Sequence, residues 1–372
     1  MSLRPAATTQ KILISTTSRL IGEFERPDAL ITHAWHPFDS HARLKMQEGP
    51  LSRNAYVFAF ETEPIERRPG VVVPDHSYVG DWICSRLAVL YGKRFDNHGV
   101  IENQGHFHIP EFSLFAEMCN HHLPQNSHSV RSNYPVPLNL SEVSRIEALI
   151  FESGLEPTFQ QRFDAAAKFY LRALQFAETD PEVAYLNLVT VGEVLSGSYE
   201  YDKEALLDDE TRDALDKIRA NCTDGTRIAS LISGKLLLIK RRFIEALVDA
   251  CDGGFFAKHE TTEDFGALQA SSFREVVAAA YDLRSQYVHT GASFGARISA
   301  NSNPFEIAVG IPVMDNMKLA KLISKAPTYR GMERIIRYAL LRFAESNGGY
   351  RATHTIEDVR SQPNESRSSS ES

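Results

Sequence analysis

Two side chains that can together cleave a phosphodiester without a metal lie close in the sequence: Arg284 and His289 have four residues between them. A guanidinium binds phosphate through a rigid set of donors, and an imidazole transfers protons near neutral pH. Such spacing also arises by chance. Arg26 and His33, with six residues between them, form a second such pair, but Pro27 opposes a helix there.

The residues around the first pair predict a helix. Residues 271–288 contain no Gly or Pro, and apolar side chains recur at helical spacing: Phe273, Val276, Val277, Ala280, Leu283 and Tyr287. A Ser-Ser pair can cap its start, and Gly291 is a stop signal. Their offset places Arg284 and His289 about 140° apart around the helix. Arg284 could bend toward the histidine, or the two could meet across a pair of identical helices, which requires a dimer.

The run Tyr-x-Leu-Arg-Ser-x-x-Val-His-x-Gly over residues 281–291 resembles the motif of HEPN-domain proteins, most closely the Apea-like HEPN group. That family is an all-helical bundle whose members often dimerise and so combine two motifs into one ribonuclease site. The resemblance covers about residues 155–345. It implies that Arg284 binds the phosphate, that His289 transfers protons, and that the 2′-hydroxyl of RNA is the nucleophile. It also implies that no metal or other cofactor is required.

The resemblance implies further site residues. Residues 186–195 resemble an earlier helix of the family that often carries an acidic residue, so Glu193 is a candidate third catalytic member that orients the arginine or the histidine. Within the motif, Tyr281 and Ser285 are candidate RNA-binding residues. Ser285 stands where many catalytic members have Asn, Asp or His.

Each of these residues also has a structural interpretation. A histidine near a helix C-terminus is favoured by the helix dipole without any chemistry. Arg284 could pair with a carboxylate of the protein's own surface. Glu193, on an otherwise apolar helix, could likewise pair with a neighbouring arginine, because buried acids are normally paired.

The net charge of −8 argues against general affinity for nucleic acid. Basic residues nevertheless gather in two places. One cluster includes Lys235, Lys240, Arg241 and Arg242, of which Lys240 and Arg241 are further candidate RNA-binding residues. In the other, only Glu333 opposes seven basic residues: Lys318, Lys321, Lys325, Arg330, Arg334, Arg337 and Arg342. These clusters could guide RNA to a site, or they could be solvated helix faces.

The length and the patterning predict two domains and an α+β fold. Residues 1–138 form a β-rich mixed domain, with strands over 56–61 and 70–74 and a helix over 81–91. Within it, residues 120–138 are typical of a linker or long surface loop.

The helical pattern that follows predicts that residues 139–350 form the HEPN-like helical bundle. One long apolar helix is expected over 227–250. Residues 351–372 are rich in Ser and Glu, which indicates a disordered tail.

The chain is expected to be cytoplasmic and not bound to a membrane. No apolar stretch approaches the ~20 residues of a membrane span, and the first residues lack the apolar core of a signal peptide. Four cysteines without CxxC spacing fit a reducing compartment.

Histidines concentrate in the N-terminal part of the chain. His33-x-x-His36 and His106-x-His108 have spacings that a metal site could use, but no complete zinc signature is present. No metal site is therefore expected, although a zinc-dependent hydrolase in this half stays an alternative. A pocket for a ligand or for a phage or host molecule is another.

Two functions from different classes follow. In the first, the chain is a homodimeric, metal-independent endoribonuclease whose partner is RNA, a toxin or an anti-phage defence effector. Its N-terminal domain would sense a trigger or bind a regulatory protein or ligand. In the second, the bundle is a non-catalytic interaction or nucleotide-binding module, and the motif serves only the dimer interface.

Overall fold

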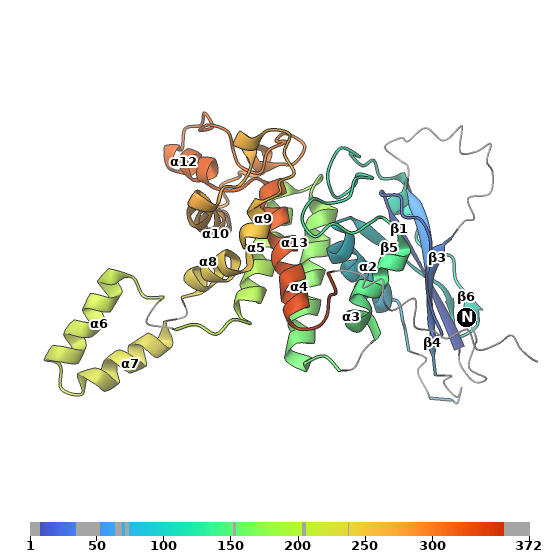
Figure 1. Cartoon of the computed structure of the whole chain (residues 1–372), viewed down its shortest axis with the longest axis horizontal. Coiled ribbons are helices and arrows are strands. Elements are labelled where there is room, and N and C mark those ends of the chain that lie inside the picture. Colours follow the sequence, from blue (N-terminus) through green and yellow to red (C-terminus); the bar gives the residue numbers. More distant parts are fainter. Residues whose placement is uncertain are drawn as a thin grey trace, which may run out of the picture.

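A computed structural model describes residues 8–34, 53–63, 69–70, 74–151, 154–202, 206–236 and 238–352 of the chain. The molecule is elongated, with an antiparallel sheet at one end, a mass of helices in the middle and a projecting pair of helices, α6 and α7, at the other end (Figure 1). An N-terminal sheet followed by a helical region gives the α+β class that the sequence predicts.

The sheet has six antiparallel strands in the order β2-β3-β4-β1-β5-β6. Their bounds are β1 Thr8–Thr16, β2 Phe24–Arg26, β3 Ala29–His33, β4 Asn54–Thr62, β5 Phe95–Asn103 and β6 His106–Phe107. The predicted strand over 56–61 is confirmed as β4, whereas the candidate over 70–74 lies largely outside the described residues. The central strand β1 is a register partner of both β4 and β5. Its sequence has no regular alternation of polar and apolar residues, and it was not among the predicted strands.

Helix α2, Tyr78–Tyr91, covers the sheet and confirms the helix expected over 81–91. It ends at Gly92, which has a φ of +64° and donates its N–H to the carbonyl of Ala88. A side chain at this position would collide with Arg131 and Arg337, because an added Cβ would lie 2.8 Å from atoms of both. The glycine therefore allows both the left-handed turn and the close approach of the two guanidinium groups.

The remaining helices follow in chain order. Their bounds are α3 Glu147–Phe151, α4 Pro157–Phe176, α5 Pro181–Ser196, α6 Asp209–Asn221, α7 Gly225–Lys235, α8 Ile239–Ala250, α9 Gly253–Phe256, α10 Phe273–Thr290, α11 Gly295–Ile298, α12 Met317–Lys325 and α13 Tyr329–Ser346. The single helix expected over 227–250 is two helices, α7 and α8. The break falls where Leu238 takes a left-handed conformation, with a φ of +48°.

One hydrophobic core runs through the sheet and the central helices. Its buried side chains extend from Ile12 of β1 to Tyr350 beyond α13. Helix α2 packs against the sheet on one side and against α4 on the other. Among the described helices, none combines the length and apolar character that a bilayer crossing requires.

Helix α13 buries charged residues as well as apolar ones. Glu333, Arg334 and Arg337 are almost completely enclosed. Glu333 accepts hydrogen bonds from Arg131, at 2.9 Å, and from the hydroxyl of Tyr170. Charges removed from water must be paired and hydrogen-bonded, so these contacts fix where α13 lies against the rest of the molecule.

Arg334 and Arg337, the two enclosed arginines of α13, bind segments far away in the sequence. Arg334 pairs with the buried carboxylate of Glu306, with an Nη2–Oε2 distance of 2.9 Å. Arg337 donates to the carbonyls of Val89 and Leu90 at the end of α2, at 3.1 and 2.6 Å. It also donates to two carbonyls of the segment 120–138, those of Asn133 at 2.7 Å and Tyr134 at 3.2 Å.

Two expectations about this region are wrong. The segment 120–138 is not a surface loop, because several of its side chains are buried: Leu123, Gln125, Asn126, Arg131, Asn133 and Val136. Arg334 and Arg337 are not part of a basic RNA-guiding face, because both are enclosed and bound to carboxylates or carbonyls. Polar composition suggested exposure, but these polar groups satisfy one another in the interior.

Replacing Arg337 by Met should lower the free energy of unfolding by about 3 kcal/mol or more, because four buried carbonyls lose a charged donor. Arg342→Met, on the same helix but half-exposed, should cost less than about 1 kcal/mol. Chemical denaturation of both variants measures the difference. Equal stability of the two variants would contradict this role of Arg337.

Candidate functional site

The Arg-His motif lies on α10, which packs against α5, α8 and α12. The expected apolar stripe is buried from Phe273 to Leu283, and Tyr287 is partly exposed. Gly291, with a φ of +68°, ends the helix and donates its N–H to the carbonyl of Tyr287. The predicted motif helix and its stop signal are therefore confirmed.

Glu193 of α5 lies against the motif, where the resemblance stated above leads us to expect an acidic residue. Arg284 donates from Nη2 to Oε2 of Glu193 at 3.3 Å, and the two side chains are 27% and 20% exposed. The Arg284 guanidinium also lies 5.9 Å from the centre of the Tyr281 ring. One carboxylate and one aromatic ring thus hold the guanidinium while leaving part of it open to solvent.

Tyr281 connects this group to the helix α8. Its ring packs against Phe243 with 5.4 Å between centroids. Burial raises the pKa of Tyr281, and the negative charge of Glu193, together with a hydrogen bond to it, raises the pKa further. The tyrosine therefore stays a hydrogen-bond donor at neutral pH.

His289 lies apart from these three residues. It is exposed in the last turn of α10, about 7.5 Å along the helix axis from Arg284 at 1.5 Å per residue. Its side chain makes no hydrogen bond or ion pair with another described residue. Ser285 is half-buried and likewise makes no side-chain hydrogen bond to another described residue. The structure thus assembles Arg284, Glu193 and Tyr281 but not His289.

The two basic candidates of α8 are already engaged. Lys240 pairs with Asp282 on the motif helix at 2.6 Å, so it ties α8 to α10. Arg241 pairs with Asp208 and donates to the carbonyl of Leu206, at the root of the α6–α7 pair. Neither residue presents a free cation, and RNA would have to compete with these carboxylates.

Glu182 has a role that the sequence did not reveal. The run 179–182 predicts a capping box, but Asp180 alone caps α5, by accepting from the N–H of Val183 at 3.0 Å. Glu182 instead accepts hydrogen bonds from Ser293 Oγ, at 2.5 Å, and from the N–H of Gly295, at 2.8 Å.

Burial alone would raise the pKa of Glu182, but these bonds outweigh it and lower the pKa. The carboxylate fixes the chain directly after the motif helix. A glutamate in the first turn of a helix is normally interpreted as a capping residue. The sequence alone therefore gave no signal of the contact of Glu182 with Ser293 and Gly295.

The N-terminal histidines do not form a metal centre in the described part of the chain, where no group of three or more suitable side chains comes together. His106 and His108 line a hollow of about 490 Å³ with Asp75, Ser77 and Asn103. His98 is buried and hydrogen-bonds to Ser15 Oγ at 2.8 Å. His36 and His41 lie outside the described residues.

Comparisons with protein-family models, with curated proteins and with solved structures found no match for this chain. The geometry of α10 and its neighbours is therefore the basis for any assignment of function.

Removing the charge of Glu193 should lower the pKa of Tyr281 without restoring its ordinary value, because burial is the larger cause of the shift. We expect Glu193→Gln to show this in a tyrosine titration by NMR, with Tyr281→Phe identifying the signal. The pair is partly exposed, so the variant should lose less than about 1 kcal/mol of stability. An unchanged Tyr281 titration would argue against the contact.

Proposed function

We propose that this chain is a metal-independent endoribonuclease of the HEPN type that acts as a homodimer. The observation that carries the proposal is the group of Arg284 and Tyr281 of α10 with Glu193 of α5, together with an exposed His289 further along α10. The helices α4, α5, α8, α10 and α13, packed around a shared core, are consistent with a HEPN-like bundle.

Arg284 is the phosphate-binding residue in this proposal. A guanidinium has five N–H donors in a fixed fork, and its bond to Glu193 uses one Nη atom. The remaining donors can bind the phosphate of RNA while Glu193 and the Tyr281 ring keep the group in place.

His289 is the proton-transfer residue. It would take the proton of the 2′-hydroxyl as that oxygen attacks the phosphorus, and a second histidine or the same one would return a proton to the departing 5′-oxygen. The products are a 2′,3′-cyclic phosphate and a 5′-hydroxyl, and neither step needs a metal. Because His289 is away from Arg284 in one chain, a complete site would combine motifs from two copies.

We further propose that the protein is a cytoplasmic toxin or anti-phage effector and that its sheet-containing part regulates the nuclease. The hollow beside His106 and His108 is a place where a regulatory ligand or protein could bind. Strand β6, which begins at His106, is far from α10 in Figure 1. Through the continuous core, a change at this end could reach the central helices.

A non-catalytic interaction or nucleotide-binding module is the second candidate. The bond of Arg284 to Glu193 is compatible with it, because a structural ion pair would look the same. The observation that favours it is His289, which no described carboxylate or carbonyl orients, whereas catalytic histidines commonly have such a partner.

Expression of the wild type and of His289→Ala or Arg284→Ala in a bacterial host, followed by sequencing of RNA ends, tests the two candidates. New ends with cyclic phosphates should appear in the wild type and fall by about 100-fold or more in both variants, the scale of a lost acid–base group. Arg274→Ala is the matched control, because this arginine lies on α10 but pairs with Glu245. Phage infection is included as a trigger.

Purified protein should cleave RNA equally well in the presence of EDTA. Identical RNA ends in the wild type and both variants, with all proteins folded and dimeric, would instead support the interaction module. Loss of cleavage in EDTA would contradict the metal-independent mechanism.

A further inference from the structure

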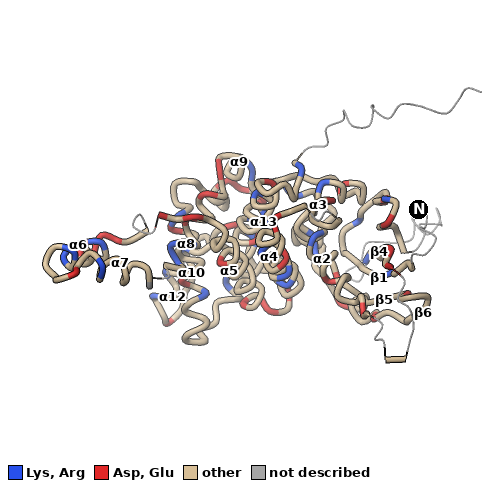
Figure 2. Tube along the Cα trace, turned by 90° about the horizontal axis from the view of Figure 1, so that it is seen from below, with Lys and Arg blue, Asp and Glu red and all other residues tan. Residues whose placement is uncertain are grey.

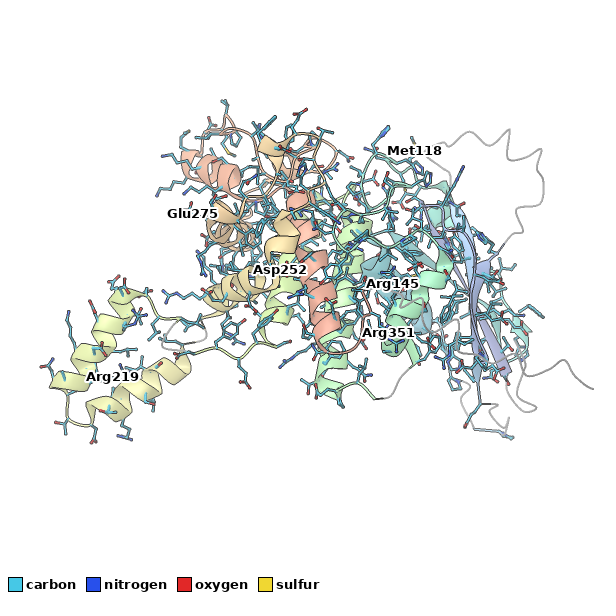
Figure 3. All side chains as sticks on the ribbon, viewed as in Figure 1. Met118, Arg145, Arg219, Asp252, Glu275 and Arg351 are labelled. Carbon is cyan, nitrogen blue, oxygen red and sulfur yellow. The ribbon has the colours of Figure 1, made fainter. Side chains whose placement is uncertain are left out.

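The α6–α7 arm, defined here as residues 206–236, extends away from the central helices (Figures 1 and 2). Its side chains reach into solvent on both sides, and Arg219 marks its position in Figure 3. The two helices bury few residues between them: Leu207, Leu215 and Ala229. Helices of 13 and 11 residues are marginal when isolated in water. An arm with so small a core gains stability from any further surface that it contacts.

The outer face of α6 carries three carboxylates in one line. Asp209, Asp213 and Asp216 are exposed, and offsets of four and three residues place them on the same side of the helix. Asp209 and Asp216 contact arginines of their own helix at 2.9 and 2.7 Å. Asp213 has no ion pair with any described residue.

Helix α12 carries a matching line of cations. Lys318, Lys321 and Lys325 are exposed at offsets of three and four residues, on the side away from the buried Leu319 and Ile323. None of the three lysines has an acidic partner in the part of the chain that the structure describes. Three like charges without partners on one helix face are a favourable contact for an acidic surface.

The two lines match when the helices run antiparallel, because the offsets of four and three on α6 then face offsets of four and three on α12. The facing pairs would be Asp209 with Lys325, Asp213 with Lys321, and Asp216 with Lys318. Within one chain the arm and α12 lie apart in Figure 1, where α10 and α8 lie between them. Because the acidic line of α6 and the lysine line of α12 are apart in one chain, their match indicates a contact between two chains.

We propose that the acidic face of α6 docks on the lysine face of α12 in a second copy of this chain, and that the second copy does the same in return. Reciprocal docking satisfies two-fold symmetry with two identical contacts. Because α12 packs on α10, the partner is held beside the motif helix. The inference deepens the proposed function, which needs a dimer, but its test uses no RNA.

Charge reversal tests the docking in the full chain. One variant carries Asp213→Lys and Asp216→Lys, and the other carries Lys318→Glu and Lys321→Glu. Asp209 is left unchanged because it stabilises the first turn of α6. Each variant alone places like charges opposite each other, so its dimer dissociation constant should rise by at least about tenfold in analytical ultracentrifugation.

An equimolar mixture of the two variants should dimerise again. In the mixed dimer the arm lysines of one variant meet the α12 glutamates of the other, and the remaining contact has its natural charges. Restoration by mixing requires docking between chains, since contact within one chain would not be affected by a partner. Added salt should weaken the wild-type dimer.

Lys168→Glu with Arg172→Glu, both exposed on α4, is the control and should leave dimerisation unchanged. Circular dichroism melting verifies that all variants fold. A monomeric wild type across the micromolar range, single variants that dimerise as well as the wild type, or a mixture that stays monomeric would each overturn the proposal. A dimer that is weakened in each single variant and restored by mixing, but does not cleave RNA, would overturn only the proposed nuclease.

Discussion

The buried charges of α13 are the constraint on which the rest of the structure depends. Glu333, Arg334 and Arg337 bind segments that are far apart in the sequence. Glu333 accepts from Arg131, Arg334 pairs with Glu306 before α12, and Arg337 donates to carbonyls at the end of α2 and in the segment 120–138. Enclosing three charges on one helix is tolerable only when every one has its partner. Apolar contacts alone would allow α13 to slide or rotate, whereas these hydrogen bonds and ion pairs form only in one position of the helix. The sheet and the central helices are therefore joined by directional contacts as well as by a shared core.

The motif helix takes its position from this framework. Helix α13 packs on α5 and α8, and these two helices supply the residues that hold Arg284 and Tyr281. The Arg284–Glu193 geometry is thus decided by packing inside one chain. His289 lies beyond the packed part of α10, where the helix has reached the surface. In the proposed nuclease, the groups around His289 would be supplied by RNA or by another subunit.

Local pattern predicted much of this structure. The motif helix, β4 and α2 follow from periodicity and from Gly92 and Gly291, which act on residues close in sequence. The resemblance to HEPN proteins led us to expect Glu193 beside Arg284, and the tendency of buried acids to pair also allowed each of the two to bind a residue of opposite charge. The packed segment 120–138 and the role of Glu182 depend on partners far along the chain. Composition cannot show such partners, because a polar side chain that satisfies a buried group looks like one that faces water.

In the basic run 318–342, some cationic side chains are buried and others are exposed to solvent. Its enclosed members are arginines, Arg334 and Arg337, while Lys318, Lys321 and Lys325 stay exposed. A planar guanidinium can distribute its donors over several carbonyls and is weakly hydrated, whereas an ammonium is a compact and strongly hydrated charge. The same stretch therefore supplies both the interior bonds of α13 and the free cations of α12. Only the latter can attract a partner, and because α12 packs on α10, that attraction acts next to the motif helix.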